Sequence, residues 1–247
     1  MLDPALPDPL DPNKPQSSSR PTSHIALETA VVFLVCVLPN LFNSTALLFL
    51  SDRTPTPFLY QYLAWLIQCL AEIGLVLYII HRSCEPFATF GLKPFHFRPD
   101  VLGAVATFAL GIAAHYGIWI LLSIVLGSEM TGSLAKQNTS GFASSSAAGA
   151  TLLILLVSVA NGFAEELIVR AYFIPRFERL FSSTPLAILL STAIFASYHT
   201  YQGTGGVISI TALGLVYGLI FSRYRRLWPL AIAHALADLL ALTYWIK

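Results

Sequence analysis

Two adjacent glutamates and an arginine lie inside a strongly apolar segment of the chain. Glu165, Glu166 and Arg170 occur in the stretch VANGFAEELIVRAYF, whose other residues are mostly aliphatic, aromatic or small. At the centre of a lipid bilayer each such charge costs about 2.5 kcal/mol or more. Charged groups are retained there when they pair with one another or carry a function. This segment is therefore a candidate for a reactive site.

Two further ionisable groups follow in apolar segments nearer the C-terminus. The sequence FASYH places Phe195 four residues before His199, and HALAD places His234 four residues before Asp238. Residues with this spacing share one face of a helix. Imidazoles and carboxylates are the side chains most often used as general bases and acids. We expect the segments to meet in one polar site, with Phe195 as a packing residue that places His199.

Helical spacing places Glu165 and Glu166 on different faces of the expected helix. Glu166 and Arg170 are one turn apart and are expected to pair, either as a structural ion pair or as part of the catalytic apparatus. Glu165 points about 100° away, toward the face that also carries Asn161 and Ser158. This polar stripe is expected to face the interior of a bundle or a water-filled cavity.

The elements that position these groups are expected to be membrane helices. The 247 residues are 55% hydrophobic and only 11% charged, with a mean hydropathy of +0.69. This composition is far from that of a soluble domain and predicts an all-α, polytopic transmembrane helical bundle. We expect seven spans, at about residues 26–50, 58–80, 101–126, 150–173, 185–199, 206–222 and 227–246.

The chain divides into three parts. Residues 1–25 are polar and rich in proline, which predicts a disordered cytoplasmic tail. Residues 26–149 hold the N-terminal spans, where Pro39 and Asn40 are expected to kink the first helix. Residues 150–247 hold the ionisable groups and form the expected catalytic core.

Glycines mark expected close contacts and turns. Gly214 and Gly218 are four residues apart in the sixth expected span, a spacing that lets two membrane helices approach closely. Gly205 and Gly206 precede that span and are expected to form the turn into it.

Basic residues predict the orientation. Arg82, Arg176 and Arg226 fall in connections on the side of the N-terminus, whereas Arg53 and Lys136 fall on the other side. Because cytoplasmic loops carry the excess of Lys and Arg, the N-terminus is expected in the cytoplasm, with the protein in the cell membrane. The net charge of +1, spread over these loops, excludes a nucleic-acid partner and leaves the lipid bilayer as the surroundings.

Three motifs together carry a family resemblance. They are EELIVR from Glu165 to Arg170, FASYH ending at His199, and HALAD from His234 to Asp238. Their order resembles the CPBP (Abi) family of intramembrane proteases, which includes the type II CAAX prenyl endopeptidases. The resemblance covers roughly residues 150–245. Ala171 stands where glycine is frequent in the family, and Asp238 where the CAAX enzymes typically have asparagine.

The resemblance implies a metal-free endopeptidase that acts on a membrane-associated peptide or protein. In such an enzyme Glu165 and His199 would activate a water, while His234 and the residue at Asp238 would stabilise the oxyanion. The residues themselves suggest another role for Asp238, because an aspartate can accept the second ring N–H of His234 and fix its tautomer. Because Asp238 differs from the asparagine of the CAAX enzymes, the resemblance does not identify the substrate.

Other functions use the same residues. Glu165, His199 and His234 would form a plausible catalytic zinc set with an open position for water. A proton- or ion-coupled transporter would use buried Glu, His and Arg as a relay, although no inverted repeat is evident. A non-catalytic membrane scaffold is the third alternative.

Overall fold

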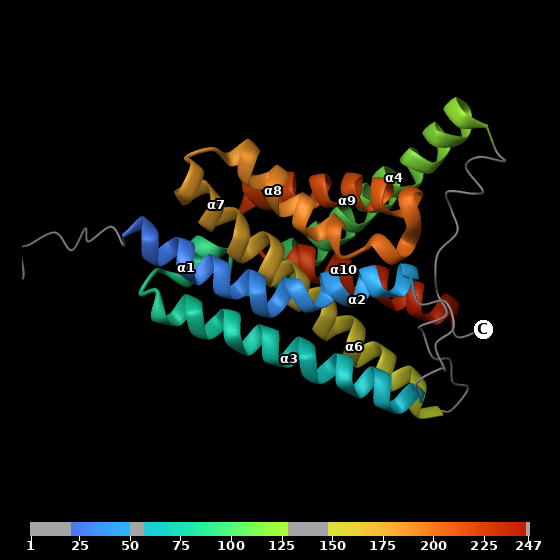
Figure 1. Cartoon of the computed structure of the whole chain (residues 1–247), viewed down its shortest axis with the longest axis horizontal. Helices are drawn as coiled ribbons and strands as arrows, with labels where there is room; N and C mark the ends of the chain where they lie inside the picture. The colour runs from blue at the N-terminus through green and yellow to red at the C-terminus, as the bar shows by residue number, and fades with distance from the viewer. Residues whose placement is uncertain (1–20, 50–56, 128–147, 246–247) are drawn as a thin grey trace, which may run out of the picture.

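The computed structural model describes residues 21–49, 57–127 and 148–245, and within these ranges it contains helices and no strand. Lipid offers no partner to backbone N–H and C=O groups, so an apolar chain in a membrane must satisfy them within each segment. The helical bundle in Figure 1 meets this condition and confirms the predicted fold class. Most of the predicted tail and of the connection between the third and fourth spans lies outside the described residues.

The helices have the following bounds in chain order. The α-helices are α1 (Thr22–Val32), α2 (Leu38–Phe49), α3 (Phe58–Arg82), α4 (Phe97–Leu126), α6 (Ala148–Glu166), α7 (Ile174–Phe181), α8 (Thr184–Ser197), α9 (Gly203–Tyr224) and α10 (Trp228–Trp245). Two π-helical segments, η1 (Phe33–Val37) and η3 (Leu167–Phe173), and two 3₁₀ turns, η2 (Phe87–Phe90) and η4 (Thr200–Gln202), complete the described elements.

Five of the apolar helices are long enough to cross a membrane. They are Thr22–Leu47, Phe58–Arg82, Phe97–Leu126, Ala150–Phe181 and Thr200–Tyr224. Two more apolar helices, Thr184–Ser197 and Trp228–Thr243, are shorter. These seven units correspond to the seven expected spans, but the fifth and the seventh fall below the length that a perpendicular crossing requires.

Both π-helical segments end two residues before a proline. A proline ring clashes with the carbonyl group four residues earlier, and for Pro39 and Pro175 that carbonyl lies inside η1 and η3 respectively. The wider π turn accommodates the clash, so the chain stays helical at both places. At Pro39, where we expected a kink, the helix widens into η1 and then continues as α2. The fourth span likewise runs on to Phe181, although we expected it to end near residue 173.

Two expected helix boundaries were wrong. The first helix begins at Thr22 rather than near residue 26, because Pro21 caps it and Ile25 is already buried. The turn before α9 is made by Gly203, whose φ of 74° favours glycine. Gly205 and Gly206, the expected turn residues, lie inside α9 and are buried.

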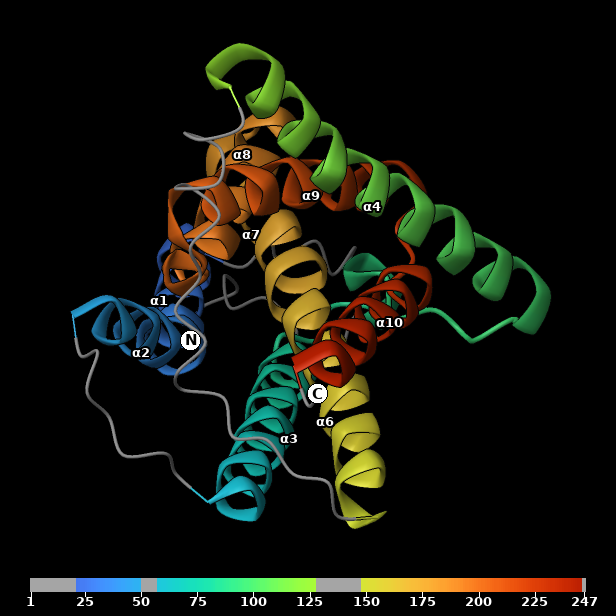
Figure 2. The same ribbon diagram turned by 90° about the vertical axis from the view of Figure 1, so that its right-hand side faces the viewer.

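The helices pack around the segment formed by α6 and η3. α6 lies against α10 on one side and α3 on the other, while α4 lies across α9 and α10. α8 packs between α7 and α9. Figure 2, a view from one end of the molecule, shows α6 and α10 crossing near the centre. The ionisable motifs of the sequence therefore lie on central helices.

Ion pairs fix the connection between α3 and α4. Arg226 forms two hydrogen bonds with the buried Asp100 carboxylate, of 2.7 and 2.6 Å, at the start of α4. Arg176 of α7 is fully buried and pairs with Glu85 at 2.5 Å. The basic residues here are thus compensated by acidic partners, and they tie this connection to α7 and α10.

Glycines allow the central helices to touch. A Cβ atom added at Gly162 of α6 would lie 2.5 Å from the backbone nitrogen of Ala235 in α10. Added Cβ atoms at Gly214 and Gly218 of α9 would lie 3.0 Å from Thr192 and 2.9 Å from Ile188, both on α8. The predicted close approach at Gly214 and Gly218 is therefore observed, and Gly162 makes a second one.

Replacing Gly162 with alanine should separate α6 from α10, because the added methyl group meets backbone atoms that cannot rotate away. We expect a loss of thermal stability in detergent, together with a loss of any activity that needs both helices. Gly74→Ala in α3 is the matched control, since nothing lies within 4 Å of its added Cβ. Equal melting temperatures for the two variants would contradict the close contact.

Candidate active site

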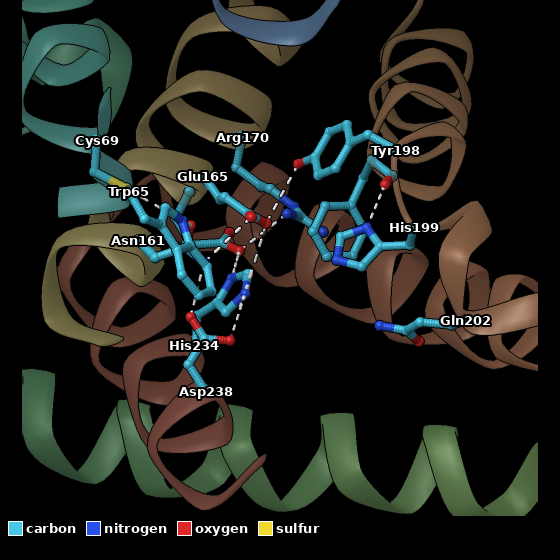
Figure 3. Close-up of polar contacts among 12 residues, drawn as sticks. Trp65, Cys69, Asn161, Glu165, Arg170, Tyr198, His199, Gln202, His234 and Asp238 are labelled. Atoms are coloured by element: carbon cyan, nitrogen blue, oxygen red, sulfur yellow. Dashed lines mark hydrogen bonds and ion pairs between the residues drawn. The ribbon is translucent and has the colours of Figure 1, made fainter. Parts of the chain in front are cut away.

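The ionisable residues of the three motifs lie on four neighbouring elements. Glu165 and Glu166 end α6, and Arg170 follows in η3. His199 lies in the turn between α8 and η4, two residues beyond the end of α8. His234 and Asp238 lie one turn apart on α10. Figure 3 labels five of these six side chains, Glu165, Arg170, His199, His234 and Asp238, and shows them near one another.

Glu166 joins two of the motifs. Its Oε1 atom accepts a hydrogen bond of 2.9 Å from Arg170 and one of 2.7 Å from His234 Nδ1. The side chains of Glu166 and Arg170 are fully buried. Because a carboxylate paired with arginine acts as an acceptor, Nδ1 of His234 carries the proton and Nε2 is the nitrogen that faces away from Glu166.

Nε2 of His234 lies between two other carboxylates. It is 3.7 Å from Glu165 Oε2 and 3.6 Å from Asp238 Oδ1. Glu165 and Asp238 keep 18% and 20% of their side-chain surface exposed, so water can reach these carboxylates. From the residue types we expected Asp238 to accept the second ring N–H of His234 and fix its tautomer. Glu166 makes this contact instead, because its carboxylate is the one at Nδ1.

Two uncharged side chains, Asn161 and Tyr198, hold the partly exposed carboxylates, and a third, Trp65, holds Asn161. Asn161 donates to Glu165 Oε1 at 3.2 Å and to Asp238 Oδ2 at 2.8 Å, and Trp65 Nε1 donates to Asn161 Oδ1 at 3.1 Å. The Tyr198 hydroxyl donates to Glu165 Oε2 at 3.3 Å. The sequence placed Asn161 on the face of Glu165, but Trp65 and Tyr198 were missed. No local pattern links Trp65 to residues nearly a hundred positions away.

His199 is held by a contact with the preceding helix, α8. Its Nδ1 lies 2.7 Å from the carbonyl oxygen of Phe195. A carbonyl accepts only, so Nδ1 donates and Nε2 of the neutral ring is left as an acceptor. Among the described contacts, none joins His199 to Glu165. The Phe195 ring centroid is 4.6 Å from that of His199 and 5.9 Å from that of His234, so Phe195 packs against both histidines.

Aromatic rings complete the surroundings of Arg170. Its guanidinium lies 4.2 Å from the centre of the Phe195 ring and 5.6 Å from that of Tyr217. Nε and Nη2 have no hydrogen-bond partner among the described residues. The negative faces of the two rings compensate part of this buried positive charge.

The described part of the chain does not bring together a set of metal-ligating side chains. Within residues 21–49, 57–127 and 148–245, no group of three or more His, Cys, Asp or Glu side chains is arranged to hold a metal ion. Glu165 and His234 of the suggested zinc set are neighbours, whereas His199 lies on the Tyr198 side of the site in Figure 3.

Replacing Arg170 with leucine should destabilise the protein strongly, because it leaves the Glu166 carboxylate buried without its permanent positive partner. Loss of one partner of a buried ion pair costs about 3–5 kcal/mol. Unfolding by SDS titration from detergent micelles would measure it. Arg179→Leu is the control, since Arg179 is 35% exposed and its pair with Glu85 should contribute less than about 1 kcal/mol. Similar costs for the two variants would contradict this assignment.

Comparison with known proteins gives one match. The family model described as "Type II CAAX prenyl endopeptidase Rce1-like" matches residues 147–240. This range holds all three motifs and the elements from α6 to most of α10. The search of curated proteins and the search of solved structures gave no significant match. Residues 147–240 are thus similar to the type II CAAX prenyl endopeptidases, as the three motifs predicted, and this similarity suggests a membrane-embedded protease.

Proposed function

We propose that this protein is an intramembrane endopeptidase that hydrolyses a peptide bond of a membrane-associated protein. The observation that carries the proposal is the position of His234 Nε2, 3.7 Å from Glu165 and 3.6 Å from Asp238, in a partly exposed site within an apolar bundle. A general base and a hydrogen-bond donor this close together can both reach one scissile carbonyl. The family match at residues 147–240 supports hydrolysis of a peptide bond.

Glu165 is the proposed general base. Hydrogen bonds from Asn161 and Tyr198 fix its carboxylate, while part of its surface stays exposed to an attacking water. Glu165 takes a proton from this water as the oxygen bonds to the scissile carbonyl carbon. The same proton then passes to the leaving amine when the C–N bond breaks. His199, whose acceptor nitrogen Nε2 is free of the Phe195 contact, assists in orienting the water.

His234 is the proposed oxyanion donor. When Nε2 is protonated, its N–H can donate to the oxygen of the tetrahedral intermediate, and Glu166 at Nδ1 stabilises the positive ring. Glu166 and Arg170 are fully buried and do not reach a substrate. We therefore assign them positioning roles that act through His234. Asp238 supports the protonated ring from the side of Nε2.

Replacing Glu165 with glutamine should abolish turnover and preserve the fold, because the amide keeps the shape and removes the base. Purified protein in detergent would be tested on a fluorogenic farnesylated peptide with a CAAX ending, and we expect a loss of at least about 100-fold in kcat. Glu72→Gln is the matched control. Glu72 is another buried membrane glutamate, and its partners Gln68 and Asn40 lie outside the site.

The outcomes separate the possible functions. Full activity of Glu165→Gln would refute the assignment of the base. Inhibition of the parent by a chelator, reversed by added zinc, would refute the metal-free mechanism and favour the zinc set. Absence of cleavage by the parent would count against a CAAX-type substrate and favour the transporter and scaffold alternatives.

Orientation in the cell membrane is a separate proposal. The excess of Lys and Arg in the connections on the N-terminal side supports a cytoplasmic N-terminus, with the connection after α3 also in the cytoplasm. Cys84 in this connection is exposed, whereas Cys36 and Cys69 are buried. A membrane-impermeant maleimide should therefore label the protein only after cells are permeabilised, and Cys84→Ser should remove the labelling. Labelling of Cys84 in intact cells would place the N-terminus outside.

A further inference from the structure

We propose that Asn161 is a positioning residue that holds the carboxylates of Glu165 and Asp238 on either side of His234, and that Trp65 of α3 fixes the Asn161 amide for this purpose. This inference rests on the proposed endopeptidase function and adds two residues to its machinery. Neither residue belongs to the three motifs, and Trp65 lies outside the matched range 147–240.

The hydrogen-bonding chemistry determines which way the amide points. The indole N–H of Trp65 only donates, whereas the two ionised carboxylates only accept. The Asn161 amide satisfies all three contacts in one orientation alone, with Oδ1 toward Trp65 and Nδ2 toward Glu165 and Asp238. Cys69, one turn after Trp65 on α3, also points its sulfur toward Oδ1 at 3.8 Å.

The bridge selects which carboxylate oxygens face His234. Asn161 uses Glu165 Oε1 and Asp238 Oδ2, and the other oxygens, Oε2 and Oδ1, are those that lie 3.7 and 3.6 Å from His234 Nε2. Two carboxylates this close to one imidazole repel each other, and two N–H donors on a single amide offset that repulsion. Without the bridge Asp238 loses its amide donor, and Glu165 keeps only one of the two hydrogen bonds described above, the one from the Tyr198 hydroxyl to Oε2.

Asn161 lies on α6 at a place where its side chain can also contact α10. Asn161 lies one turn before Glu165 on α6, and the adjacent Gly162 lets α10 approach closely. That approach brings Asp238 within 2.8 Å of the amide. Figure 3 shows Trp65 and Asn161 on the side of Glu165 opposite to Tyr198 and His199. The N-terminal part of the chain thus contributes directly to the geometry of the site.

The first test needs no substrate. The side-chain N–H signals of tryptophan would be recorded by NMR for the full-length protein in detergent micelles, with the Trp65 signal assigned through Trp65→Phe. Asn161→Ala should move the Trp65 signal upfield, because the indole loses its acceptor. The Trp228 signal should stay in place, since Trp228 donates to the carbonyl of Lys93. A Trp65 signal that does not move would overturn the inference.

The second test measures catalysis on the farnesylated reporter peptide. Asn161→Ala should lower kcat by about 10- to 100-fold, the range typical of groups that orient catalytic side chains, with KM within about twofold of the parent. Trp65→Phe should lower kcat less, and should have no further effect in the Asn161→Ala background. Trp119→Phe in α4 is the matched control and should retain the kcat of the parent.

The two tests distinguish failure of the inference from failure of the proposed function. Parental kcat in Asn161→Ala, or additive effects of the two substitutions, would overturn the positioning role while the peptidase stands. If the parent does not cleave the reporter, the proposed activity on CAAX-type peptides fails. The NMR result then decides the inference alone.

Discussion

A carboxylate at Glu166 that no solvent reaches must have its charge balanced by protein groups, and Arg170 and His234 are the groups that balance it. The cost of leaving this charge unpaired in an apolar bundle holds the end of α6, which carries Glu166, against His234 of α10. It also fixes the orientation of the His234 ring, since Nδ1 is committed to Glu166. The position of Nε2, on which the proposed chemistry depends, is a consequence of this electrostatic requirement.

Polar contacts continue from this pair across the bundle. Trp65 of α3 contacts Asn161 of α6, which contacts Asp238 of α10, while Tyr198 beyond α8 contacts Glu165. Each contact is satisfied by a partner on another element or one turn away, as buried polar groups in a membrane require. The network therefore specifies how the helices are arranged as well as how the site is built. Close helix packing at Gly162 makes the contact between Asn161 and Asp238 possible.

The sequence predicts the parts of this structure that local chemistry determines. Apolar stretches indicate the helices, and the spacing of Glu166 and Arg170 indicates their pairing, because both depend on neighbours in the chain. The acceptor at His234 Nδ1 could not be predicted, since helical spacing favoured Asp238 and only tertiary packing brings Glu166 there. The contribution of Trp65 was equally hidden, because it requires knowing which faces of α3 and α6 meet. The sequence shows the prolines that follow the π-helical segments η1 and η3. It does not show that the helix accommodates each proline by widening.

The length of α4 makes the surrounding membrane a mechanical variable. At 1.5 Å per residue its 30 residues extend about 45 Å, whereas the hydrocarbon core of a bilayer measures about 30 Å. The first turn of α4 carries Arg98 and Asp100, and the residues after them, 101–126, still extend about 39 Å. A helix with this mismatch tilts or thickens the lipid around it. α4 lies against α9 and α10, and α10 carries His234 and Asp238. We therefore expect a change in bilayer thickness to alter the tilt of a helix that contacts the reactive one, and through it the geometry of the site.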